Sequence, residues 1–75
     1  MKEIKLRAKE EIRIVKGHYW IFSNELEKID KTIEPGEIVR VLDARGAVLG
    51  TGFFNPHSLI AARLITRGGY FLLKL

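Results

Sequence analysis

The fold is decided by residues 37–54, whose sequence is EIVRVLDARGAVLGTGFF. Apolar and polar residues alternate over 37–42, which predicts a half-buried strand. The next four residues, 43–46, predict a hairpin turn in which Gly46 takes a positive φ. Residues 47–54 predict the returning strand. The centre of the chain is therefore expected to be an antiparallel pair of strands.

Outward from this hairpin, short strands and turns recur every 8–12 residues. A period of two predicts a strand near the start, and acidic residues followed by a terminal Lys16 and Gly17 favour a short helix. The expected elements are strands at 3–8, 18–22, 26–33, 59–66 and 70–75 and a helix at 9–16. The sequence thus predicts one domain, residues 1–75, of mixed α/β, mostly β class. Its architecture is a small barrel of about six short strands with one short helix, because closure removes exposed strand edges.

Composition restricts the class of protein. The 75 residues are 47% hydrophobic and 29% charged, which fits a folded domain rather than a disordered or membrane chain. No apolar run approaches the ~18–20 residues of a membrane span, and the first residues do not have the pattern of a signal peptide. Cysteine is absent, which excludes disulfides and Cys-ligated zinc and agrees with a cytoplasmic location. The small size favours a binding module over an enzyme.

The charge is unevenly distributed along the chain. Residues 1–43 hold nine basic and nine acidic residues, whereas residues 44–75 hold four basic residues and no acid. Three of those four are arginines, Arg45, Arg63 and Arg67, whose guanidinium groups suit bidentate contacts to phosphate. The surplus of +4 fits a nucleic-acid partner, and a basic solvated surface is the alternative.

No catalytic or metal-binding arrangement is evident. The Gly50-Thr51-Gly52 segment lies within a predicted strand and opens no helix, so close packing explains it better than phosphate binding. His18 and His57 have no cysteine or second histidine nearby in sequence. Each of them either caps a loop or makes a hydrogen-bonding or stacking contact to nucleic acid.

The aromatic residues divide into core and surface candidates. Trp20 and Phe22 share one face of a strand, which predicts that they are buried, and Tyr19 then points outward as a stacking candidate. The predicted core comprises Trp20, Phe22, Val39, Val41, Leu49 and Leu64. Of the adjacent Phe53 and Phe54, one is expected to face inward and the other outward.

The two arginines of the predicted strand 59–66 and its end are four residues apart. In a regular strand, Arg63 and Arg67 would share a face about 13 Å apart. Such a pair would follow an RNA backbone rather than clamp a single phosphate. The alternative is that both arginines are solvated charges on the strand surface and bind no ligand.

Three segments together resemble a known family. They are Lys16-Gly17-His18-Tyr19-Trp20-Ile21-Phe22-Ser23-Asn24-Glu25, then Gly36-Glu37-Ile38-Val39 with Val41-Leu42-Asp43 and Gly46, and then Leu49–Ser58 followed by Ile60, Arg63 and Leu64. In order and spacing they resemble the PUA domain that opens a family of rRNA cytosine-5 methyltransferases, over residues 4–67. One departure is Tyr19, where that family usually has proline.

The resemblance implies a PUA-like pseudobarrel that binds structured RNA, by this reading rRNA, and positions a partner active site. It also implies a downstream methyltransferase domain that binds S-adenosylmethionine, which this chain does not contain. The chain alone is therefore expected to have no catalytic, cofactor-binding or metal-binding residue and to contact no membrane. By this resemblance the chain is either the N-terminal module of such a protein or a free-standing relative of it. If it is a fragment, the parent would be an S-adenosylmethionine-dependent rRNA methyltransferase.

Two further functions compete with RNA binding. One is a structural or protein-interaction β-barrel that docks through its hydrophobic C-terminal strand, and the other is one piece of a longer enzyme. For the RNA-binding module, we expect the loop at 18–19 and the loop at 55–58 to form one patch with Arg63 or Arg67. The predicted RNA-binding residues are Lys16, His18, Tyr19, Arg45, Asn55, His57, Arg63 and Arg67.

Overall fold

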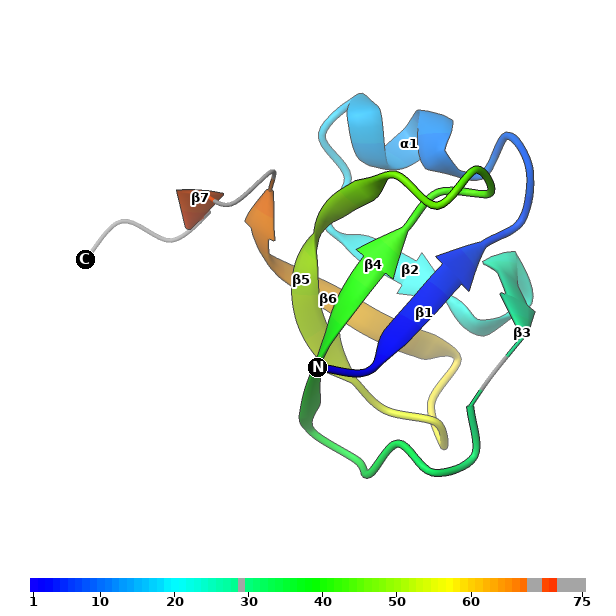
Figure 1. Ribbon diagram of the computed structural model, residues 1–75, viewed down its shortest axis with the longest axis vertical. Coiled ribbons are helices and arrows are strands. Elements are labelled where there is room, and N and C mark those ends of the chain that lie inside the picture. The colour runs from blue at the N-terminus through cyan, green and yellow to red at the C-terminus, as the bar shows by residue number, and fades with distance from the viewer. Residues whose placement is uncertain (29, 68–69, 72–75) are drawn as a thin grey trace.

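A computed structural model describes residues 1–28, 30–67 and 70–71. The described part is mostly β structure with one short α-helix, as predicted (Figure 1). In chain order the elements are β1 (Glu3–Leu6), α1 (Glu11–Val15), β2 (Trp20–Phe22), the 3-10 helix η1 (Ser23–Glu25), β3 (Leu26–Lys28), β4 (Glu37–Leu42), β5 (Val48–Phe54), β6 (Ile60–Arg67) and β7 (Tyr70–Phe71).

The strands form a single curved sheet in the order β2-β6-β5-β4-β1-β3, with β7 paired to the outer end of β6. Only the β1–β4 pair is parallel among the described pairings. The sheet rolls into a nearly closed barrel, and α1 lies across one end of it (Figure 1). This confirms the predicted pseudobarrel. No helix of the described chain is long and apolar enough to cross a membrane.

Two glycines explain how β5 and β6 pack so closely. A Cβ atom at Gly50 would lie 2.1 Å from the carbonyl oxygen of Thr66, and one at Gly52 would lie 2.4 Å from that of Arg63. Both contacts are to backbone, which cannot move aside by changing rotamer. The Gly-Thr-Gly segment therefore allows close packing between the paired strands β5 and β6, as predicted.

The helix and the central turn end at glycines with positive φ. Gly17 has φ +112° and its N–H donates to the carbonyl of Ile14, 3.0 Å away, which ends α1. Gly46 has φ +90° in the β4–β5 turn.

The predicted strand at 26–33 is shorter than expected. The strand β3 ends at Lys28, and Asp30 then accepts a hydrogen bond from the N–H of Thr32, 2.8 Å away.

The core prediction is right for the central strands and wrong for β2. Val39, Val41 and Leu64 are buried, and Leu49 is partly buried against the core. Trp20 and Phe22 are instead 45% and 38% exposed. The buried cluster comprises Ile4, Leu6, Ile14, Ile21, Leu26, Ile33, Val39, Val41, Phe54, Ala61, Ala62 and Leu64.

The cross-strand pairing explains which face of β2 is buried. Ile21 lies opposite Ala62, and Ala62 lies opposite Phe54, so these three residues form one interior row. The side chains of Phe54 and Ile21 are both fully buried in this row. Residues next to an inward position point outward, which places Trp20 on the surface. Of the two adjacent phenylalanines, Phe54 faces inward and Phe53 outward, as expected.

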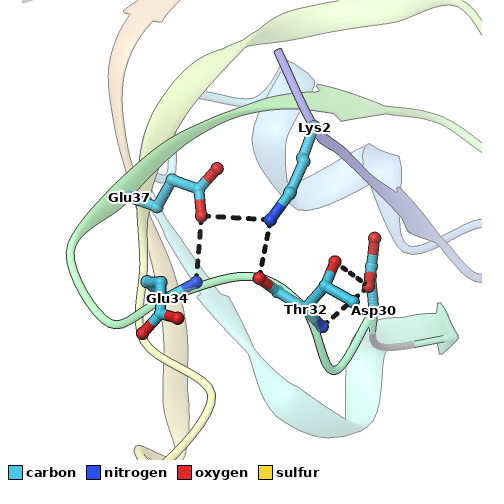
Figure 2. A network of polar contacts seen from close by, with 5 residues as sticks. All are labelled: Lys2, Asp30, Thr32, Glu34 and Glu37. Atoms are coloured by element: carbon cyan, nitrogen blue, oxygen red, sulfur yellow. Dashed lines mark hydrogen bonds and ion pairs between the residues drawn. The ribbon is translucent and has the colours of Figure 1, made fainter.

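A polar network fixes the loop that connects β3 to β4 against the start of β1 (Figure 2). The ammonium group of Lys2 donates to the carbonyl of Thr32, 2.6 Å away, and lies 3.6 Å from the carboxylate of Glu37. Glu37 also accepts a hydrogen bond from the N–H of Glu34 at 2.9 Å. The positive charge of Lys2 is thus partly neutralised on this side of the molecule.

Candidate nucleic-acid interface

The ribbon formed by β2 and β6 carries the most unusual surface chemistry of the described residues. Trp20 lies opposite Arg63, and the guanidinium carbon of Arg63 sits 5.6 Å from the centre of the Trp20 ring. That distance is within the range of a cation–π contact. The side chain of Arg63 is exposed and makes no hydrogen bond or ion pair to any described residue. Its five N–H donors are therefore available to a ligand.

Arg67 has a different role from the one predicted. Thr66 lies opposite Thr51, and Leu64 lies opposite the next residue of β5, Gly52. Ile65 therefore has no partner on β5 and forms a bulge in β6. Arg67 then pairs with the inward-facing Gly50 and does not share the outer face of Arg63. The prediction of two arginines on one face is wrong, because it assumed a regular strand.

The guanidinium group of Arg67 instead holds the α1–β2 connection in place. It donates to the carbonyl of Ile14 at the end of α1 and to the carbonyl of His18, 3.1 Å away. Its guanidinium carbon also lies 5.5 Å from the centre of the Tyr19 ring. The ring of Tyr19 is 50% exposed, as predicted for a stacking residue. Arg67 therefore positions Tyr19, and two of the five N–H donors of its guanidinium group are used by backbone carbonyls.

The free edge of β2 is covered by an ion pair. Arg13 of α1 contacts the carboxylate of Glu25 through two nitrogens, at 2.8 and 3.3 Å. Arg13 also donates to the carbonyl of Trp20 at 3.0 Å, and Glu25 accepts from the N–H of Phe22 at 2.7 Å. Those backbone groups face away from β6, where a neighbouring strand would otherwise pair. The ion pair thus substitutes for a strand and protects the edge.

Glu25 also perturbs a second carboxyl group. A hydrogen bond to Glu25 is the largest cause that raises the pKa of Glu10 above its ordinary value of 4.5, followed by desolvation and by repulsion from the Glu25 charge. The positive charge of Arg13 opposes this shift. Glu10 and Glu25 therefore place acidic charge at the edge of β2, close to Arg13.

The predicted site residues fall into two groups at opposite ends of the barrel. The loop that contains His18 and Tyr19 lies at the α1 end, whereas residues 55–58 lie at the far end, in yellow in Figure 1. Lys16 ends α1, and Arg45 lies in the β4–β5 turn at that same end. The expectation of one patch built from both loops is therefore wrong.

The residues of the loop at 55–58 line two different depressions. Asn55 shares a shallow depression with Phe53 and Arg63, whereas His57 lines another one with Lys31 and Pro35. The side chain of Asn55 accepts a hydrogen bond from the N–H of His57 at 3.0 Å, which shapes the turn. Of the far loop, Asn55 is thus the residue that lies beside the β2–β6 ribbon.

A shallow groove of about 390 Å³ follows the near end of that ribbon. Trp20 and Phe22 are in it, although sequence reasoning placed both in the core. No local signal could have identified them, because Trp20, Ile21 and Phe22 are all apolar and either face of the strand could be buried. The groove is lined by Arg13, Gly17, His18, Tyr19, Trp20 and Phe22.

Comparison with known proteins places this barrel in a family. Residues 4–67 match the family described as a PUA-like domain, and the chain belongs to that family. The fold is shared with a solved structure, a putative SAM-dependent methyltransferase from Streptococcus mutans, which superposes with a TM-score of 0.72 over 100% of this chain and 18% of that one, at 15% identity.

Curated relatives carry a more specific name. The chain is 36% identical over 61 residues to ribosomal RNA large subunit methyltransferase I of Tolumonas auensis, which covers 81% of this chain and 15% of that protein. It is 31% identical over 58 residues to ribosomal RNA large subunit methyltransferase of Deinococcus radiodurans, covering 77% of this chain and 14% of that protein. The chain therefore spans only a small part of the relatives that it matches.

Proposed function

We propose that this chain is an RNA-binding module that holds rRNA for a methyltransferase domain elsewhere in the same protein. The observation that carries the proposal is the β2–β6 ribbon, where the exposed rings of Tyr19 and Trp20 each lie beneath an arginine. Aromatic rings stack on unpaired bases, and a guanidinium group that is not bound to the protein, as in Arg63, binds phosphate. The names of the curated relatives support rRNA as the ligand. By the motif resemblance, the reaction of the parent would be methylation of cytosine at C5 in the cytoplasm.

The described residues do not fit a site for S-adenosylmethionine. Such a site in a Rossmann-like domain needs a glycine-rich loop between a strand and a helix. Here the helix α1 has five residues, and Gly50 and Gly52 lie within β5, where they pack against the backbone of the paired strand β6. We therefore assign no step of methyl transfer to this chain.

Of the four cationic residues predicted to bind RNA, three are available to phosphate. Lys16, Arg45 and Arg63 are exposed and make no hydrogen bond or ion pair through their side chains to the described residues. Arg67 is excluded from this set because its guanidinium group is bound to backbone carbonyls. Three contacts predict a slope of log K against log salt of about −2, from roughly −0.7 per contact with single-stranded RNA.

A salt titration of RNA binding tests the proposal. The 75-residue chain should bind a ribosomal RNA hairpin with a slope near −2, and Arg63→Gln should make the slope shallower by about 0.7. Lys5→Gln is the matched control, because Lys5 lies on β1, paired to β3 and β4 rather than to the ribbon. Absence of binding at low salt, or a slope near zero, would overturn the proposal. The alternative of docking through the C-terminal strand concerns residues 70–75, of which 72–75 lie outside the described residues.

A further inference from the structure

A row of outward side chains crosses four strands of the sheet. Trp20 on β2 lies opposite Arg63 on β6, Arg63 lies opposite Phe53 on β5, and Phe53 lies opposite Ile38 on β4. Residues directly opposite each other point to the same face of a sheet. Trp20, Phe53 and Ile38 are 45%, 46% and 42% exposed, so the face is open. The row therefore presents two aromatic rings with a cation between them.

Close packing keeps this row in register. Gly52, the neighbour of Phe53, lies against the backbone of Arg63, as described above. The interior row of Ile21, Ala62 and Phe54 fixes the opposite face of the same three strands. The two rings and the arginine are thus displayed on a rigid scaffold rather than on a loop.

Polar groups lie beside one end of the row. A shallow depression of about 440 Å³ adjoins Phe53 and Arg63, and Asn55 and Ser58 are on its rim. The oxygen of the Asn55 side chain is used by the turn, but its amide N–H groups make no hydrogen bond to the described chain. The hydroxyl oxygen of Ser58 accepts from the N–H of Ile60 at 3.2 Å, which leaves its O–H free to donate. Both side chains are able to donate to the edge of a base.

We propose that this outer face of β2, β6 and β5 is a platform for an unpaired segment of RNA. One base stacks on the face of the Trp20 ring that Arg63 does not cover and another on Phe53, while the free N–H groups of Arg63 contact the phosphate between them. Asn55 and Ser58 donate hydrogen bonds to the edge of the base on Phe53. The proposal rests on the RNA-binding function above and adds to it the class of substrate, namely unstacked nucleotides.

The spacing and charge of the face favour this ligand. Neighbouring strands are about 4.8 Å apart, so residues on β2 and β5 are about 10 Å apart with Arg63 midway. Sheets that bind RNA use aromatic residues on adjacent strands in this way, each stacking one base. No acidic residue occurs in residues 44–75, which supply Arg63, Phe53, Asn55 and Ser58. A duplex hides its bases, so it would leave both rings unused.

The experiment uses Trp20, which is the single tryptophan of the chain. A single-stranded hexanucleotide, such as six adenosines, should quench its fluorescence saturably, and a blunt duplex of the same length should not. Phe53→Leu keeps the apolar surface but removes the ring, and it should weaken hexanucleotide binding about 5- to 150-fold, the range that corresponds to the loss of one stacked base. Val48→Ala is the matched control, because Val48 is an exposed apolar residue on the same strand.

The outcomes separate the platform from the wider function. Circular dichroism and thermal unfolding first establish that Phe53→Leu and Val48→Ala are folded like the unsubstituted chain. If the hexanucleotide does not quench Trp20, or if Phe53→Leu binds it as well as Val48→Ala does, the platform is overturned. In that case a ribosomal RNA hairpin that still binds with a slope near −2 would leave the proposed function intact. Failure of both ligands to bind would overturn both proposals.

Discussion

Gly52→Ala tests whether the close packing of β5 against β6 supports the row formed by Trp20, Arg63 and Phe53. The added Cβ would lie 2.4 Å from the carbonyl oxygen of Arg63, whereas ordinary van der Waals contact begins at 3.4 Å. The strands must therefore separate locally by about 1 Å, which strains the ladder hydrogen bonds on both sides. Overpacking a well-packed site costs about 1–3 kcal/mol, and a conflict with backbone belongs at the upper end of that range. We expect the free energy of unfolding to fall by about 3 kcal/mol.

Urea unfolding followed by the fluorescence of Trp20 measures this change. Gly46→Ala is the control, because Gly46 has φ +90° but a Cβ there meets nothing within 4 Å. It should cost only the left-handed backbone penalty of about 1–2 kcal/mol. The small domain has a low reserve of stability, so a loss of about 3 kcal/mol would leave Gly52→Ala visibly less folded. If the two variants lose the same free energy, the steric reasoning about β5 and β6 is refuted.

Three further predictions concern the ribbon and its supporting charges. Tyr19→Ala should weaken RNA binding by about 1–3 kcal/mol in a binding titration, with unfolding free energy changed by less than ~1 kcal/mol because the ring is half exposed; unfolding of the domain would instead make the ring structural. Glu25→Gln should lower the free energy of unfolding in urea by about 1–3 kcal/mol, less than for a fully buried pair because the Arg13 side chain is 37% exposed; an unchanged midpoint would contradict the edge-covering role. Glu10→Gln should stabilise the chain at pH 7 and lose that advantage below pH 4.5, because the raised pKa of Glu10 penalises its ionised form in the folded state; thermal unfolding at several pH values measures this, and a benefit that persists at low pH would be contrary to it.

The parts of the fold that depend on local patterns are predictable from the sequence. The central hairpin, the helix end at Gly17 and the packing role of Gly50 and Gly52 all follow from residue type and spacing. These features arise from steric properties of single residues and from a period of two. The acid-free second half of the chain is likewise visible without a structure.

The sequence alone does not predict which face of β2 is buried or which residues of β6 share a face. Trp20, Ile21 and Phe22 are all apolar, so a period of two allows either face to be buried, and the choice depends on Ala62 across the sheet. The bulge at Ile65 depends on the register between β5 and β6, which no local signal encodes. Because Ile65 has no partner, Arg63 and Arg67 lie on different faces of β6.

Tertiary contacts also decide which predicted cations remain available. Arg67 looks like Arg63 in the sequence, yet it is bound to carbonyls at the end of α1. Its partners lie about fifty residues away in the chain, as does the Tyr19 ring that it covers. Only the folded chain brings these groups together, so the sequence predicts a basic surface but not which of its members bind a ligand.

The most direct test of the central claim is a map of backbone amide chemical shifts on addition of a ribosomal RNA hairpin with an unpaired loop. The account predicts that the largest changes fall on residues 16–22 and 60–64, with Phe53 and Asn55 beside them. The amides of β1 and of the polar network around Lys2 and Glu37 should change least, because they lie away from the ribbon. Changes confined to β1, β3 and the 30–37 loop, or no changes at all, would contradict the account.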